Sequence, residues 1–161
     1  MPQVGYALSN SAQVALAAGV AKTTLMLITP ASHGVVLKRL TICLASVTPT
    51  DVSGMVELVT STNATNSTPG TGNTTETANI QQIYGRVIAL SSSFTAFGAS
   101  TSEPTVLTSK WKKLLSPVGS TFAYDWPLGT EPDNVPSAGI GIRLTYPSAV
   151  NCLTSLEFER I

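Results

Sequence analysis

The feature that most constrains this chain is a succession of short runs in which apolar and polar residues alternate, with turn-forming residues between them. The fullest runs are Thr23–Thr29, Val35–Ala45, Met55–Thr60, Ala138–Tyr146 and Cys152–Phe158. Alternation with a period of two places successive side chains on opposite faces of a β-strand. No stretch has the periodicity of a long amphipathic helix, which argues against an architecture of alternating strands and helices.

The longest run, Val35–Ala45, predicts a strand with one better-buried side. Val36, Lys38, Leu40, Ile42 and Leu44 fall on one face, which is mostly apolar. The other face carries Leu37, Arg39, Thr41 and Cys43. A strand of this kind has one face on a core and the other toward a more polar environment.

Eight or more short strands with turn signals between them predict an all-β chain, a jelly-roll-like β-sandwich with at most one short helix. The 161 residues fit a single domain, residues 1–161. Ile80–Leu90 stays open between strand and short helix. Its apolar residues have helix-like spacing, but Gly85 interrupts them.

Two segments are expected outside the sandwich. Residues 1–12 are predicted as an N-terminal arm that lies on a partner or adds to a neighbour's sheet. Residues 61–79 contain no large apolar side chain and are predicted as a polar surface loop.

Composition excludes several functional classes. The chain has 9 Lys+Arg and 9 Asp+Glu, and its charged fraction of 11% is far below the roughly 25% of an average domain. Zero net charge argues against nucleic-acid binding. No apolar run is long enough to span a membrane, and the first residues do not resemble a signal peptide, so we expect a protein made in the cytoplasm. So few charges also indicate that an assembly covers part of the surface.

The sequence offers few groups for catalysis or metal binding. The enzymatic alternative is a hydrolase that uses His33 or the pair Glu157 and Glu159. A histidine at a turn and a solvated strand end are the simpler interpretations. Cys43 and Cys152 lie in strand-like runs and fit small buried side chains better than a disulfide or metal pair. We therefore expect no enzyme activity, no catalytic residue, no cofactor and no metal site.

Short motifs in a fixed order carry a resemblance to a known group of proteins. They are Tyr6-Ala7-Leu8, Ala21–Leu25, Pro30-Ala31, Val56-Glu57-Leu58, Glu103–Leu107, Pro127–Pro132, Tyr146–Asn151 and Leu156–Glu159. This order resembles small virion proteins of tailed bacteriophages, particularly those that infect actinobacteria, and among them head decoration (capsid-stabilising) proteins. The resemblance covers most of the chain except residues 61–79.

The resemblance implies a homotrimer on the outside of an icosahedral head. Such proteins bind the major capsid protein where its subunits meet at three-fold or quasi-three-fold positions, and they stabilise the capsid against the pressure of packaged DNA. Three copies acting together multiply weak contacts through avidity. The expected location is the capsid exterior of a virion assembled in the host cytoplasm.

The candidates for partner contacts are Val4 and Tyr6 in the arm, and Trp111 with its neighbours Lys110 and Lys112. Large aromatic side chains anchor interfaces, but they also fill sandwich cores, and both assignments stay open for Trp111 and Trp126. The alternative function is a tail, baseplate or fibre-head module that binds host surface glycans. A binding module unrelated to viruses is a third class.

Overall fold

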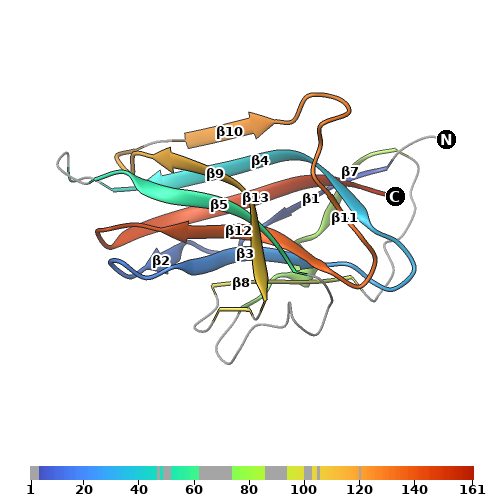
Figure 1. Cartoon of the computed structure of the whole chain (residues 1–161), viewed down its shortest axis with the longest axis horizontal. Helices are drawn as coiled ribbons and strands as arrows, with labels where there is room; N and C mark the ends of the chain where they lie inside the picture. The colour runs from blue at the N-terminus through green and yellow to red at the C-terminus, as the bar shows by residue number, and fades with distance from the viewer. Residues whose placement is uncertain are drawn as a thin grey trace.

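The computed structural model shows two antiparallel β-sheets packed face to face (Figure 1). It describes residues 4–46, 48, 52–61, 74–85, 94–99, 103–104, 106–119 and 121–161. The predicted all-β sandwich is confirmed. The only helical element among these residues is one short 3₁₀ turn, η1 (Thr77–Asn79).

The first sheet has the strand order β10-β4-β13-β1-β7. These strands are β10 (Thr121–Asp125), β4 (Val35–Ala45), β13 (Val150–Arg160), β1 (Gly5–Ser9) and β7 (Gln81–Tyr84). Two short strands extend it, because β11 (Asp133–Asn134) pairs with β4 and β2 (Val14–Leu16) pairs with β13. We call this sheet A.

The second sheet, sheet B, has the strand order β6-β8-β3-β12-β5-β9. These strands are β6 (Thr74–Thr75), β8 (Thr95–Gly98), β3 (Lys22–Ile28), β12 (Gly139–Thr145), β5 (Gly54–Ser61) and β9 (Leu107–Leu115). Every pair of neighbouring strands within it is antiparallel.

The connectivity of the main strands is that of a jelly roll. Without the accessory strands β2, β6, β7, β8 and β11, sheet A has the order β1-β13-β4-β10 and sheet B the order β3-β12-β5-β9. In chain order, the first strand therefore lies beside the eighth, and the second beside the seventh. This is the double Greek key of jelly rolls. One consequence matters for function: β9 and β10, the edge strands of their sheets, lie on the same side of the sandwich (Figure 1).

The core fills the space between the sheets. Its fully buried side chains include Leu8, Leu25, Leu40, Ile42, Leu58, Ile140, Tyr146, Leu156 and Phe158. A smaller cluster of Met26, Ile28, Val59 and Phe97 is also buried, with Leu107 against it. Since Met26 and Val59 alternate with core residues along their strands, parts of sheet B are apolar on both faces.

A β-bulge changes the predicted faces of β4. Leu37 pairs with Phe158 whereas Arg39 pairs with Glu157, so Lys38 is an extra residue on this strand. The bulge shifts the alternation by one position. As a result Leu37 joins the core side and Val36 is only half-buried, the reverse of the prediction for these two residues. The prediction holds for Leu40, Ile42 and Leu44.

The prediction of an N-terminal arm is corrected for the described residues. Residues 4–12 belong to the sandwich, because β1 lies between β13 and β7 within sheet A. Val4 and Tyr6 are 6% and 3% exposed, and the Tyr6 ring stacks on Phe158 at 5.6 Å. The alternation in this segment is therefore that of a central strand. Residues 1–3 lie outside the described residues.

The polar segment after β5 contains more structure than expected. Residues 62–73 lie outside the described residues, but β6 and η1 follow them. Glu76 is buried and accepts hydrogen bonds from the backbone and hydroxyl of Ser11 and from the Asn79 amide. Gln81–Tyr84 forms a strand, so the first part of Ile80–Leu90, which was open between strand and helix, is a strand. Residues 86–90 lie outside the described residues.

A buried polar cluster joins the two sheets. The Asn10 amide donates a hydrogen bond to the Thr24 carbonyl at 2.7 Å, on β3 of sheet B. Its oxygen accepts hydrogen bonds from the backbone N–H and the hydroxyl of Thr154, on β13 of sheet A. All three side chains are buried. Asn10 therefore crosslinks the sandwich and pairs the Thr154 N–H, which a purely apolar contact would leave without a partner.

Candidate functional site

Four aromatic rings line the side of the sandwich between β9 and β10. Trp111 lies on β9, Phe122 and Tyr124 on β10, and Trp126 directly after it. Ring centroids are 6.0 Å apart for Trp111–Phe122, 5.8 Å for Trp111–Tyr124 and 5.3 Å for Tyr124–Trp126. We call this row the aromatic ladder. All four side chains are half-buried, and Trp111, Phe122 and Trp126 pack against the core.

The local sequence explains the ladder. Phe122, Tyr124 and Trp126 follow one another at spacings of two, so an extended chain directs all three rings to the same side. The rings of Phe122 and Tyr124 are stacked, whereas Trp126 meets Tyr124 edge to face at 84°. These are favoured arrangements of aromatic pairs, and together they fix the ring orientations. At the other end, the Lys113 ammonium lies 4.6 Å from the centre of the Phe122 ring.

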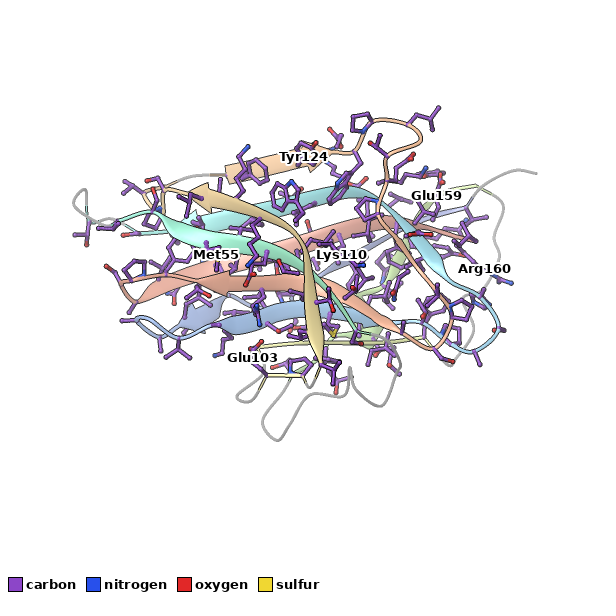
Figure 2. All side chains as sticks on the ribbon, in the orientation of Figure 1. Met55, Glu103, Lys110, Tyr124, Glu159 and Arg160 are labelled. Atoms are coloured by element: carbon purple, nitrogen blue, oxygen red, sulfur yellow. The ribbon has the colours of Figure 1, made fainter. Side chains whose placement is uncertain are left out.

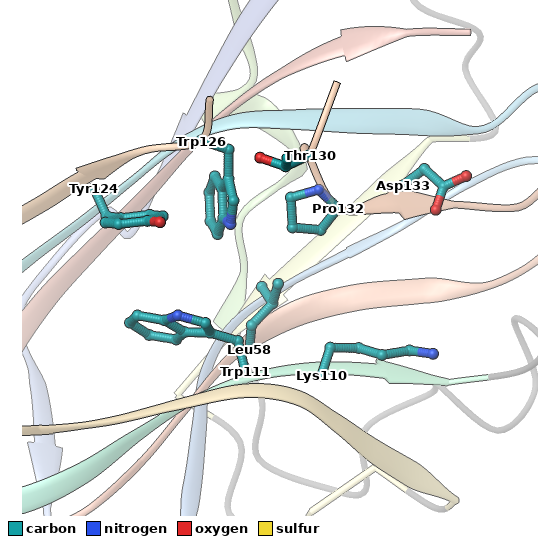
Figure 3. Close-up of a pocket in the computed structure, with 8 residues that line it drawn as sticks. All are labelled: Leu58, Lys110, Trp111, Tyr124, Trp126, Thr130, Pro132 and Asp133. Carbon is teal, nitrogen blue, oxygen red and sulfur yellow. The ribbon is translucent and has the colours of Figure 1, made fainter. Parts of the chain in front are cut away.

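A second β-bulge brings Lys110 beside Trp111. Leu58 of β5 pairs with Trp111 and the next residue, Val59, pairs with Ser109, so Lys110 is the extra residue. In a regular strand, Lys110 and Trp111 would point to opposite faces. Here both line the same groove (Figure 3). Figure 2 shows Lys110 and Tyr124 on the facing edges of the two sheets.

The groove has two adjoining parts. The first, of about 430 Å³, is lined by Leu58, Lys110, Trp111, Tyr124, Trp126, Thr130, Pro132 and Asp133. The second, of about 230 Å³, is lined by Thr60, Ser61, Thr108, Lys110, Asp133, Asn134 and Val135. Lys110 and Asp133 line both parts, so the two parts lie next to each other. We call the two together the ladder groove. One half of it is aromatic and the other half carries hydroxyl and amide groups.

The upper rim, residues 126–134, is held by sheet A. The Trp126 N–H donates to the Lys38 carbonyl at 3.1 Å, and the Leu37 N–H donates to the Pro132 carbonyl at 2.9 Å. Between these points, Glu131 forms an ion pair with Lys38 at 3.0 Å. Backbone hydrogen bonds and the Lys38 ammonium hold the pKa of Glu131 below its usual range. The rim is therefore fixed at both ends and in its middle.

The lower rim is held by a buried ion-pair network behind β9. Glu57 on β5 is 1% exposed, and it pairs with Arg143 at 2.8 Å and with Lys112 at 3.1 Å. Burial opposes ionisation of Glu57, but hydrogen bonds from Arg143 and Lys112 outweigh it and hold the pKa below its usual range. Lys112, a predicted contact residue, thus ties β9 to its neighbours.

The outer side of sheet A is a second candidate surface. Most of its outward residues on β1, β4, β10 and β13 are exposed or half-buried, and the uncharged ones include Ala7, Ser9, Thr41, Cys43, Ala123, Leu153 and Ser155. The register aligns them across the strands, because Thr41 pairs with both Ala123 and Ser155, and Ser155 pairs with Ser9. We call this surface the neutral face. Charges begin at one end of it, where Glu157 lies between Ala7 and Arg39 and Arg39 is 3.4 Å from Asp125.

The structure separates the five predicted contact residues. Lys110 and Trp111 meet in the ladder groove, and Lys112 belongs to the Glu57 network. Val4 and Tyr6 are buried in the core, so the prediction that they contact a partner is corrected: both side chains are already covered within their own chain. Sequence reasoning missed Phe122 and Tyr124 as members of the site. The two-residue spacing of aromatics in Thr121–Trp126 was the signal that could have found them.

The remaining candidates for chemistry, His33 and Glu159, make contacts within the fold. His33 is buried, lies 5.0 Å from the Phe94 ring and has its Nδ1 2.8 Å from the Ser32 hydroxyl. Burial and the nearby Arg160 lower the pKa of His33. Glu159 accepts a hydrogen bond from the Tyr84 hydroxyl at 2.6 Å and pairs with Lys38 at 3.0 Å. These contacts tie β7, β13 and β4 together.

Cys43 and Cys152 are both free thiols. They lie on opposite faces of sheet A, because Cys152 belongs to the core whereas Cys43 belongs to the neutral face. Burial raises the pKa of Cys152 to about 12. Within the described parts of the chain, no three His, Cys, Asp or Glu side chains are grouped as metal ligands. A search of the same residues finds no helix with the length and hydropathy to cross a membrane.

The fold and the two surfaces define a class: a jelly-roll β-sandwich with an aromatic groove at one side and an uncharged outer sheet. No protein-family model matches the sequence, and comparisons with curated proteins and with solved structures gave no significant match. Function is therefore inferred from the two surfaces and from the resemblance of the short motifs.

Proposed function

We propose that this protein is a structural protein of a phage virion, a capsid decoration protein that binds the outer face of the head as a homotrimer. Its partners are two further copies of itself and the major capsid protein, and its role is mechanical, not enzymatic. It occupies three-fold or quasi-three-fold positions and stabilises the capsid against internal pressure. The observation that carries the proposal is the neutral face of sheet A.

The neutral face is unlike the usual solvent side of a sheet. In an antiparallel sandwich, outward positions are mostly polar and charged. Here Ala, Ser, Thr, Cys and Leu occupy the central outward positions of four adjacent strands. Small side chains on a pleated surface let another backbone approach closely, and depletion of charge is typical of the centre of an interface. These properties suit a surface covered by another subunit.

The jelly roll and the low charge of the chain are consistent with this role. Jelly rolls occur in viral capsid proteins, although a fold by itself does not determine function. A cyclic trimer hides part of each subunit and strengthens weak capsid contacts through avidity. A chain with 11% charged residues fits a surface of which a large part is covered.

The test introduces a charge at the centre of the neutral face. Ser155→Lys places an ammonium between Thr41 and Ser9, its partners on the neighbouring strands. We expect a folded monomer that no longer binds capsids, measured by light scattering and by sedimentation with purified particles. Val20→Lys, at a position 54% exposed in the β2–β3 turn, is the matched control and should leave both properties unchanged. A Ser155→Lys variant that still forms trimers would refute the role of this face.

The alternative position in the virion is the tail, baseplate or fibre head. The number of copies per particle separates the two, because decoration of capsid three-fold positions requires far more copies than a tail tip holds. Quantitative mass spectrometry of purified virions gives this number relative to the major capsid protein. A ratio of only a few copies per particle would favour the tail module.

A further inference from the structure

We propose that the ladder groove is a saccharide-binding site that takes an uncharged oligosaccharide, one sugar ring in the aromatic half and the next in the polar half. This site is separate from the neutral face, since it lies between β9 and the segment after β10 and opens at the side of the sandwich (Figure 3). The proposal holds whether the protein is part of the head or of the tail of the virion.

The aromatic half matches the apolar face of a sugar ring. A pyranose presents C–H groups on its faces and hydroxyls around its rim, so it binds to flat apolar surfaces that have polar groups beside them. Trp111 and Trp126 line opposite rims of the groove, with Leu58 at its floor. The edge-to-face contact of Trp126 with Tyr124 holds that ring in place, so little side-chain entropy is lost on binding.

The polar groups are placed where the sugar hydroxyls would lie. The Lys110 side chain extends along the groove, and Asp133 lies on the opposite, upper rim. An ammonium donates three hydrogen bonds and a carboxylate only accepts them, so the pair serves both functions of a hydroxyl. Thr130 adds a hydroxyl whose hydrogen already bonds to the Pro127 carbonyl, which leaves its oxygen as an acceptor.

The second part of the groove provides a further polar contact. Asn134 is 4% exposed and lines this part with Thr60 and Thr108. Among the described residues, its amide nitrogen has no hydrogen-bond partner. A buried donor without a partner is costly, and a ligand that accepts its hydrogen bond recovers that cost. Hydroxyl and amide groups around a shallow groove are the complement of a hydroxylated ligand.

Size and charge favour a saccharide over other occupants. The volume of about 430 Å³ in the aromatic half lies in the range of small-ligand sites, and the polar half adds about 230 Å³. Lys110 and Asp133 carry opposite charges, so the groove as a whole is neutral. Single-stranded nucleic acid also stacks on aromatic rings, but it requires a positively charged groove along its backbone.

The experiment titrates the purified protein with cellotriose, maltotriose and fully N-acetylated chitotriose, all uncharged, up to about 10 mM and follows tryptophan fluorescence, alongside a printed array of bacterial surface glycans. We expect at least one saccharide to give a saturable change, because Trp111 and Trp126 line the groove. Trp126→Ala and Asp133→Ala should each weaken binding about tenfold or more. Leu128→Ala, at a position 91% exposed on the same segment, should bind like the wild type.

Asp133→Ala keeps the test valid if Trp126→Ala fails to fold, because Asp133 is an exposed residue. The proposal is overturned if no saccharide on the array or in solution binds, or if binding persists unchanged in both groove variants. The proposal would also be overturned if single-stranded oligothymidylate or a peptide bound in the groove and no saccharide did. None of these outcomes depends on trimer formation, so the neutral face and the groove are tested independently.

Discussion

Asn10→Ala should destabilise the sandwich far more than the loss of one polar side chain suggests. The Asn10 amide makes three hydrogen bonds across the interior, one to the Thr24 carbonyl on sheet B and two from Thr154 on sheet A. Alanine removes all three. The cost depends on which of the groups left behind find another partner.

Each of these groups has a different fate. The Thr24 carbonyl keeps a hydrogen bond from the Ala99 N–H, so it loses only about 1 kcal/mol. The Thr154 hydroxyl lies 3.3 Å from the Thr24 hydroxyl and can pair with it. The Thr154 N–H is left buried without a partner, which costs about 1–3 kcal/mol. The expected loss of unfolding free energy is therefore about 2–4 kcal/mol, or roughly 5–15 °C in Tm for a chain of this size.

Urea denaturation followed by far-UV circular dichroism measures this loss. The matched control is Asn151→Ala, the same substitution at an exposed position of β13, which should change the stability by less than about 0.5 kcal/mol. If Asn10→Ala lost no more than that control, the hydrogen bonds would be dispensable, and the claim that Asn10 crosslinks the two sheets would be wrong.

Three other predictions concern single positions. Since the folded pKa of Glu57 is lowered, its contribution to the free energy of unfolding is complete above its unfolded pKa near 4.5 and is lost as the pH falls. Glu57→Gln should cost about 2–4 kcal/mol at pH 7, and below about pH 5 the urea midpoint of the variant should fall less with pH than that of the wild type. Gly141→Ala should cost at least about 2 kcal/mol by thermal melting, because the added Cβ would lie 2.3 Å from the Leu25 carbonyl oxygen, which is backbone and cannot move aside. In the monomer expected for Ser155→Lys, a thiol reagent at pH 8 should modify Cys43 within minutes and Cys152 only after unfolding; equal reactivity would contradict the burial of Cys152.

The alternating runs predicted the strands well because a period of two is imposed by the strand itself. Leu40, Ile42 and Leu44 are buried as the pattern of β4 indicates. What the pattern lacks is any sign of a bulge. The extra residues Lys38 and Lys110 shift the alternation within continuous strands, and a bulge is a property of the pairing with a neighbour, not of one strand.

The candidate site was predictable in part. Trp111 and its lysine neighbour were identified because large aromatics next to charge are rare in this chain. Their partners on β10 were missed, since contact between β9 and β10 follows from the order of strands in two sheets. The misassigned arm has a similar cause. Tyr6 lies in a short run near a terminus, and only its pairing between β13 and β7 makes that run a central strand.

The measurement that tests the central claim most directly is the mass of the purified protein in solution by light scattering. Coverage of the neutral face in a homotrimer predicts three times the chain mass of 16.8 kDa. The trimer should persist on dilution and should be lost in Ser155→Lys. A wild-type protein with the mass of one chain at every concentration would contradict assembly through this face.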